Sequence, residues 1–151
     1  MFKRMGILGA LLLALAATGA TGPYDESADA HATLQRGLDQ ARASGKDLLV
    51  IFGANWCKDC RELDKALHGR AAALIDARFV VVKVDVGDFD KNLDIVKHYG
   101  YPTGKGIPAA IVLAPQDKVL YATRACELAD ARHMGDDGIY NFFSNVVAEH
   151  H

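Results

Sequence analysis

The chain of 151 residues is half hydrophobic, and its 17 Lys and Arg residues against 19 Asp and Glu residues give a formal net charge of -2 at pH 7. This slightly acidic balance argues against a nucleic-acid partner, because such partners require a basic surface. No internal repeat or low-complexity tract divides the sequence, and its length suits one ordinary domain behind a short leader.

The start of the chain, residues 1–20, is predicted to be a secretory signal. Two basic residues precede an almost unbroken apolar run over 5–17, and small residues follow up to Ala20. The apolar run is shorter than the roughly 20 residues that cross a bilayer, so a retained membrane anchor is the weaker alternative. We therefore expect cleavage near Ala20, export to the periplasm or another compartment outside the cytoplasm, and one folded domain over residues 21–151.

The first part of that domain is predicted to contain a helix, a buried strand and a second helix. Small and apolar residues recur at helical spacing over 27–43, with Ser27 able to cap the start and Gly45 just past the end. The continuous apolar run over 48–52 suits a strand that is covered on both faces. After a short turn, an amphipathic helix is expected over 57–67.

The rest of the domain is predicted to alternate helices and strands before ending in a hairpin and a helix. The expected elements are a short helix over 70–76, a strand over 79–84, a helix over 90–99, strands over 109–113 and 118–122, and a last helix over 136–147. The valine-rich strand over 79–84 should pair in parallel with the first strand. The turn Ala114-Pro115-Gln116-Asp117 should join the last two strands.

Two cysteines, Cys57 and Cys60, are spaced for redox chemistry. A helix that opens at Cys57 places its sulfur beside unsatisfied backbone N–H groups and the positive end of the helix dipole, which favours the thiolate. Cys60 lies one turn further on the same face, so the two sulfurs can meet. Lys58 adds a favourable positive charge, which Asp59 opposes. We expect Cys57 to attack a disulfide and Cys60 to resolve the product.

A resemblance to the thioredoxin superfamily is carried by the sequence Trp56-Cys57-Lys58-Asp59-Cys60 after a buried strand. From about Ser27 onward the chain is similar to exported thioredoxin-like proteins related to the electron-donating periplasmic domain of the DsbD type. The resemblance implies an α/β thioredoxin fold, with a central four-stranded mixed sheet flanked by helices and an extra N-terminal helix. Trp56 could belong to the core, but because it stands next to the nucleophile we expect it to form an apolar rim that docks partner proteins.

The same resemblance assigns a role to the loop that ends at Pro108. In proteins with the thioredoxin fold a proline at this place is cis and faces the active-site sulfurs. Ile107 would then offer its backbone N–H and C=O to an extended segment of the partner. An ordinary trans proline that ends a loop is the alternative that base rates favour.

Two departures from thioredoxin affect the reduction potential that the resemblance implies. Thioredoxins carry a buried aspartate that helps to move the proton of the resolving thiol, and this chain has Ile51 at that place. Lys83 matches the lysine that accompanies that aspartate. The pair between the cysteines is Lys58-Asp59 where thioredoxin has Gly-Pro.

The function implied is thiol–disulfide exchange without a metal or organic cofactor. The resemblance favours a monomeric reductant or electron relay, with protein disulfide or dithiol clients and a membrane or soluble electron donor. A disulfide-donating oxidase would use the same residues in reverse. A Cu(I)-binding protein is a third alternative, although no histidine accompanies the two cysteines and Met134 is far along the chain.

The third cysteine, Cys126, is left without a partner in the sequence. We expect a small, half-buried side chain after the last strand. The alternative is a site for a mixed disulfide or a dimer.

Overall fold

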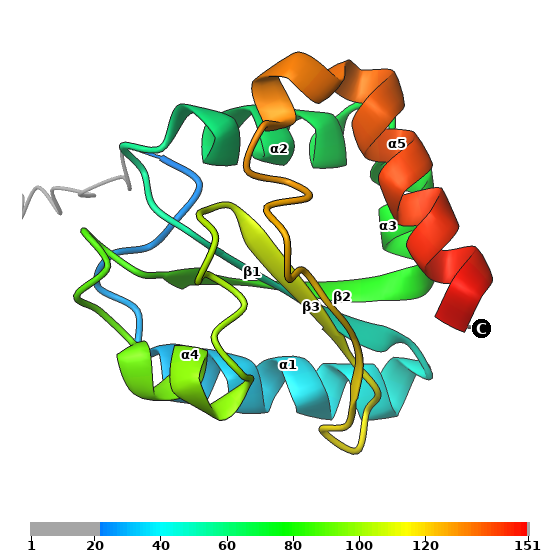
Figure 1. Ribbon diagram of the computed structural model, residues 1–151. Coiled ribbons are helices and arrows are strands. Elements are labelled where there is room, and N and C mark those ends of the chain that lie inside the picture. The colour runs from blue at the N-terminus through cyan, green and yellow to red at the C-terminus, as the bar shows by residue number, and fades with distance from the viewer. Residues whose placement is uncertain (1–21, 151) are drawn as a thin grey trace, which may run out of the picture.

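The computed structural model describes residues 22–150, so the predicted secretory signal lies outside the described residues. One mixed sheet of four strands forms the centre of the fold, as predicted, with the order β2-β1-β3-β4 (Figure 1). The strands are β1 (Asp47–Gly53), β2 (Phe79–Asp85), β3 (Ala109–Leu113) and β4 (Val119–Ala122). The strand β2 is parallel to β1, whereas β3 is antiparallel to both β1 and β4.

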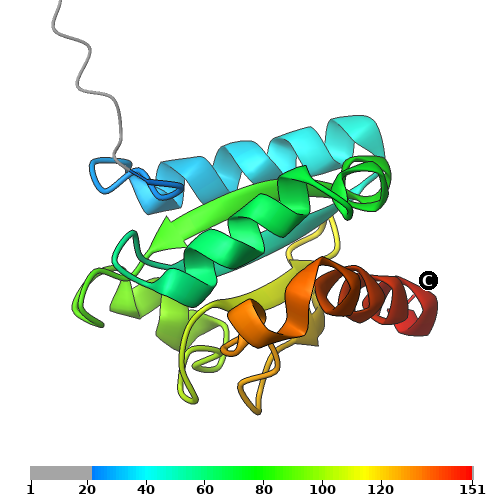
Figure 2. The same cartoon turned by 90° about the horizontal axis from the view of Figure 1, so that it is seen from above.

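Helices cover both faces of this sheet. They are α1 (Ala30–Ser44), α2 (Lys58–His68), α3 (Ala72–Arg78), α4 (Leu93–His98) and α5 (Ala131–His150). The helices α1 and α4 lie on one face, and α2, α3 and α5 lie on the other (Figures 1 and 2). Across residues 22–150, no helix combines the length and the apolar character needed to span a membrane.

The central strand β1 divides the buried side chains into two cores. Leu48, Val50 and Phe52 pack with the helices α1 and α4. Leu49 and Ile51 point to the other face and pack with α2, α3 and α5. Because side chains alternate along a strand and both faces are covered, β1 is apolar without interruption.

The helix α1 begins later than predicted because another residue caps it. The carboxylate of Asp29 accepts a hydrogen bond from the backbone N–H of Ala32 at 3.0 Å, which is the usual N-cap contact. Ser27 instead donates its hydroxyl hydrogen to Asp25 at 2.6 Å. The predicted end is confirmed, since Gly45 is left-handed with φ of 68°.

The helix α4 is shorter than the predicted helix over 90–99. Asn92 has a φ of 54°, so regular helix begins only at Leu93. Leu93 is 50% exposed, whereas Ile95 and Val96 are buried. The side chain of Asn92 donates to the backbone oxygen of Asp85 at 2.7 Å, which ties the start of α4 to the end of β2.

Two further helices differ from the prediction at their ends. The helix α3 is shifted by about two residues, and α5 begins at Ala131 instead of residue 136. A break at Gly135, with φ of 65°, separates a first turn from the rest of α5. The predicted helix over 136–147 therefore corresponds to the part of α5 after this break.

Candidate active site

Cys57 lies between β1 and α2 and is the N-cap residue of α2. Its backbone is extended, and its sulfur accepts a hydrogen bond from the backbone N–H of Cys60 at 3.1 Å. The two cysteines form a disulfide, with their Cα atoms 5.2 Å apart. Once this bond is reduced, the same N–H group and the start of the helix stabilise a negative charge on Cys57.

The loop before β3 brings Ile107 and Pro108 to these sulfurs. The peptide bond between the two residues is cis. The carbonyl oxygen of Ile107 lies 3.7 Å from the sulfur of Cys57. The fold therefore brings together residues that are 50 positions apart in the sequence.

The two cysteines differ in depth, and Trp56 borders them at the surface. Cys57 is 5% exposed and Cys60 only 1%, whereas Trp56 is 55% exposed. The indole N–H of Trp56 donates to the backbone oxygen of Gly87 at 3.0 Å. The Trp56 ring also meets the ring of Phe89 edge-on, with centroids 6.2 Å apart. The indole is thus held in place at the mouth of the site.

A surface groove continues from this rim along α4. We name it the apolar groove, and its volume is about 630 Å³. Its apolar part is formed by Phe89, Leu93, Val96, Tyr101 and Gly106. Both aromatic residues are exposed although their φ angles are positive, 63° and 57°. Bulky residues rarely adopt this conformation. Gly106 directly precedes Ile107, so the groove reaches the loop that faces the sulfurs.

The two residues between the cysteines point in different directions. Lys58 is exposed. The carboxylate of Asp59 accepts hydrogen bonds from the backbone N–H of Arg132 at 2.9 Å and from its guanidinium at 3.1 Å. Asp59 therefore joins the start of α2 to the first turn of α5.

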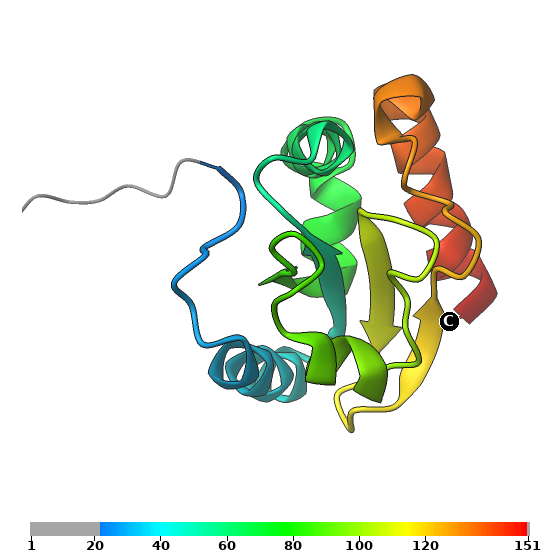
Figure 3. The ribbon, with the colours of Figure 1, turned by 60° about the vertical axis from the view of Figure 1, so that its left-hand side comes forward.

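Two residues of the site, Tyr24 and Asn55, are absent from the sequence-based prediction. The amide of Asn55 accepts from the backbone N–H of Tyr24 at 2.9 Å and donates to its backbone oxygen at 2.8 Å. The segment before α1 is thereby held against the loop that carries Cys57 (Figure 3). Tyr24 is 2% exposed. A contact between residues 31 positions apart leaves no pattern in the local sequence.

An acidic residue next to Lys83 comes from a helix. Ile51, which stands where thioredoxins carry an aspartate, is buried in the core beneath α2. Lys83 pairs with Ile51 in the sheet, and its ammonium group forms an ion pair with Asp64 of α2. Both charged side chains are largely buried, so Lys83 does not simply extend into solvent. Asp64 lies one helical turn after Cys60.

The free cysteine lies in the loop between β4 and α5. Cys126 is exposed and its φ is 57°, so the expectation of a half-buried side chain was wrong. The loop turns outward here because the carboxylate of Glu127 accepts hydrogen bonds from the backbone N–H groups of Arg124 and Ala125. This local contact directs the intervening cysteine to solvent.

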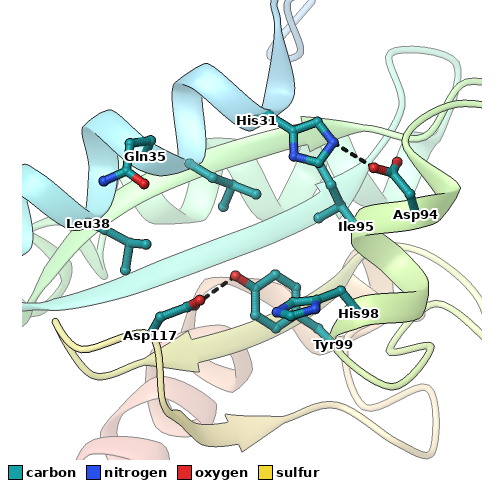
Figure 4. Close-up of a pocket in the computed structure, with 9 residues that line it drawn as sticks. His31, Gln35, Leu38, Asp94, Ile95, His98, Tyr99 and Asp117 are labelled. Carbon is teal, nitrogen blue, oxygen red and sulfur yellow. Dashed lines mark hydrogen bonds and ion pairs between the residues drawn. The ribbon is translucent and has the colours of Figure 1, made fainter.

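A separate pocket of about 350 Å³ lies between α1 and α4 (Figure 4). His31 and Asp94 meet across it at 2.5 Å, and the hydrogen bond from His31 lowers the pKa of the Asp94 carboxyl. Tyr99 donates to Asp117 at 2.8 Å. None of the lining residues belongs to the loops around Cys57 and Pro108. Residues 22–150 contain no group of three or more His, Cys, Asp or Glu side chains that could hold a metal ion.

The chain is similar to proteins of one family. The family described as Thioredoxin-like matches residues 29–115. The crystal structure of a disulphide isomerase from Xylella fastidiosa Temecula1 is 48% identical, with a TM-score of 0.81 and coverage of 83% of this chain and 97% of that chain.

Two curated relatives share part of their length with the chain. The thiol:disulfide interchange protein DsbD of Pseudomonas fluorescens is 29% identical over 122 residues, which are 73% of this chain and 20% of that protein. The protein disulfide-isomerase of Gallus gallus is 28% identical over 117 residues, which are 76% of this chain and 22% of that protein. The chain thus spans about a fifth of the length of these relatives. Because the family match covers more than half of the sequence and includes the cysteine pair, the chain belongs to the thioredoxin-like family, as its sequence predicts.

Proposed function

We propose that the protein is an exported thiol–disulfide oxidoreductase that reduces disulfides in partner proteins or relays electrons to them. One observation carries the proposal. The sulfur of Cys57 caps α2, accepts the N–H of Cys60 and lies beside the Ile107 carbonyl. The N–H group and the start of the helix stabilise this sulfur as a thiolate, and thiolates are the attacking species in disulfide exchange.

The proposed reaction has two steps. The Cys57 thiolate attacks one sulfur of a client disulfide, and the other client sulfur leaves with the electron pair and takes up a proton from solvent. Cys60 then loses its proton to solvent, and its thiolate attacks the Cys57 sulfur. The Cys57–Cys60 bond forms, the second client sulfur leaves as a thiolate and is protonated, and the client has gained two electrons.

The surroundings of Cys57 support a protein as the client. Ile107 presents its backbone oxygen next to the attacking sulfur, where an extended segment of a partner can align with it. The exposed Trp56 and the apolar groove extend the contact beyond the cysteines. Export is supported by the sequence pattern over residues 1–20 and by the similarity to DsbD. The electron donor in this proposal is a separate membrane or soluble protein.

Turnover of a protein disulfide tests the proposal. Insulin is reduced in the presence of dithiothreitol with the wild type, with Cys57→Ser and with Cys126→Ser. We expect Cys57→Ser to fall to the uncatalysed rate, because no attacking sulfur remains at the helix start. Cys126→Ser, which removes an exposed thiol elsewhere, should keep the wild-type rate. If Cys57→Ser reduces insulin as fast as the wild type does, the proposal is wrong.

A disulfide-donating or disulfide-shuffling protein is the second candidate. It is favoured by the similarity to the structure named disulphide isomerase. Donation of a disulfide would use the same two steps in the opposite direction. The equilibrium reduction potential of the Cys57–Cys60 pair against glutathione separates the two directions. A value near about -270 mV supports a reductant, and a value near about -120 mV supports an oxidant.

A further inference from the structure

We infer that the hydroxyl group of Tyr24 donates a hydrogen bond to the sulfur of Cys60 whenever the Cys57–Cys60 bond is open. The inference rests on the thiol–disulfide exchange proposed above and adds a catalytic group to it. A Cβ atom placed on Gly53 would clash with the hydroxyl oxygen of Tyr24 and would lie 2.9 Å from the sulfur of Cys60. The hydroxyl and the resolving sulfur therefore both lie close to the α carbon of Gly53.

The side chain of Tyr24 is buried next to Cys60. Tyr24 is 2% exposed, and its recorded hydrogen bonds within residues 22–150 involve only its backbone atoms. A sulfur in a disulfide is a weak acceptor, whereas a thiolate is a strong one. Opening the disulfide therefore turns the neighbouring sulfur of Cys60 into a strong acceptor for the hydroxyl.

The chain holds Tyr24 in this position through the active-site loop. Both hydrogen bonds between Asn55 and the backbone of Tyr24 originate two residues before Cys57. A third bond joins the same amide to the carboxylate of Glu26 at 3.1 Å. The tyrosine is therefore positioned by the loop whose chemistry it would assist.

The charges around Tyr24 keep its proton in place. Burial raises the pKa of Tyr24 well above its usual value, and the carboxylates of Asp64 and Asp85 raise it further. Each carboxylate has a cationic neighbour, since Lys83 pairs with Asp64 and Lys91 lies 3.3 Å from Asp85. Tyr24 therefore remains a donor throughout the pH range in which thiols exchange.

The proposed contact acts in both directions of the reaction. When Cys60 attacks the mixed disulfide at Cys57, the hydroxyl stabilises the Cys60 thiolate that forms as its proton leaves to solvent. When an incoming thiolate attacks Cys57 in the disulfide form, the Cys57–Cys60 bond breaks and its electron pair moves to Cys60. The same hydroxyl then stabilises the leaving thiolate. Tyr24 keeps its own proton in each case.

The two attacks can be followed separately with dithionitrobenzoate, a disulfide that releases coloured nitrothiobenzoate when a thiolate attacks it. One equivalent is mixed with reduced protein in a Cys126→Ser background, because the exposed Cys126 would also react. Attack by Cys57 releases a first nitrothiobenzoate and leaves a mixed disulfide. Attack by Cys60 releases the second. The variants compared are Tyr24→Phe, which keeps the buried ring, and Tyr99→Phe, which removes a hydroxyl bound to Asp117.

In Tyr24→Phe we expect an unchanged first release and a second release slowed about tenfold or more, since hydrogen bonds to charged groups are among the strong ones. The pH at which the second release reaches half its maximum rate should rise by about one unit, a change that looser packing does not produce. Tyr99→Phe should match the wild type in both steps. A second release in Tyr24→Phe within about twofold of the wild type, with the same pH profile, would overturn the inference. If the wild type does not reduce insulin, the proposed function is wrong. The two-step release can still be measured in that case, so the two failures are distinguishable.

Discussion

Gly53 occupies the end of β1 at a point where a side chain has no space. The hydroxyl of Tyr24 and the sulfur of Cys60 both pack over its α carbon. Glycine in a strand interior often marks the close approach of another group. At this position the glycine lets the resolving cysteine and the tyrosine share one small volume.

The variant Gly53→Ala is expected to lower the free energy of unfolding by about 1–3 kcal/mol, because the added methyl group overpacks a buried site. Urea unfolding of the oxidised protein measures the loss. The double variant Gly53→Ala with Tyr24→Phe provides the control. It should lose less than the two single changes together, since the hydroxyl that the methyl group meets is gone. Strictly additive losses would contradict the close approach.

At the scale of residues, the sequence predicts those parts of the site that depend on local patterns. The cysteine spacing and the helix that follows it are visible within a few residues. Pro108 is assigned its place only through the resemblance to the thioredoxin superfamily. The roles of Tyr24 and Asp64 are not predicted. Tyr24 lies against Gly53 of β1, and Asp64 of α2 pairs with Lys83 of β2. Both contacts join residues that are far apart in the sequence.

Among the elements, α4 and the turns around it form the surface next to the active site. The positive φ angles of Phe89 and Asn92 precede the helix, and that of Tyr101 follows it. These turns shorten α4 and leave Leu93 and the two aromatic rings exposed. Costly backbone conformations of this kind concentrate at functional sites. The apolar groove is therefore the part of this face that we expect a protein client to contact.

The variant Leu93→Gln tests this contact. We expect KM for insulin to rise about threefold to tenfold, because a buried apolar side chain contributes roughly 1.5–3 kcal/mol and the groove covers a client only in part. The rate with dithionitrobenzoate should not change, since so small a disulfide has no segment to lie in the groove. Val119→Gln replaces another exposed apolar residue, on β4, and serves as the control. An unchanged KM in Leu93→Gln would show that clients do not use the groove.

Strands were predicted more accurately than helix ends. Each strand is a compact apolar run, and its observed limits lie within about one residue of the predicted limits. Helix ends depend on which polar side chain caps the backbone, and several candidates compete. Asp29 replaces Ser27 at the start of α1, and the left-handed Asn92 delays α4. The first turn of α5 is not predicted, because a break at Gly135 separates it from the rest of the helix.

For the whole molecule, the segment before α1 connects the sheet's two sides. Its backbone is bound by Asn55 at the start of α2, and the segment then leads into α1 on the opposite face (Figures 1 and 3). Tyr24 belongs to the core beneath α1 and α4. The amide of Asn55 is therefore the link that couples this segment to the active-site loop.

Asn55→Ala should lower the free energy of unfolding by about 1–3 kcal/mol, because it removes two hydrogen bonds to partly buried backbone groups. Hydrogen exchange at the backbone N–H of Tyr24 should accelerate far more than exchange in β1, since the segment opens locally before the sheet does. Asn145→Ala changes an exposed asparagine of α5 and should leave both quantities unchanged. Protection at Tyr24 that survives in Asn55→Ala would show that ring burial alone holds the segment.

The outward direction of Cys126 makes the oxidised protein suitable for selective labelling. Its thiol is the one free thiol among the chain's three cysteines, and it is exposed. A maleimide dye would therefore attach at a single position while the other two sulfurs remain protected by their bond. Ala129 of the labelled loop lies close to Gly106, so fluorescence from that loop is expected to report when a client occupies the neighbouring surface.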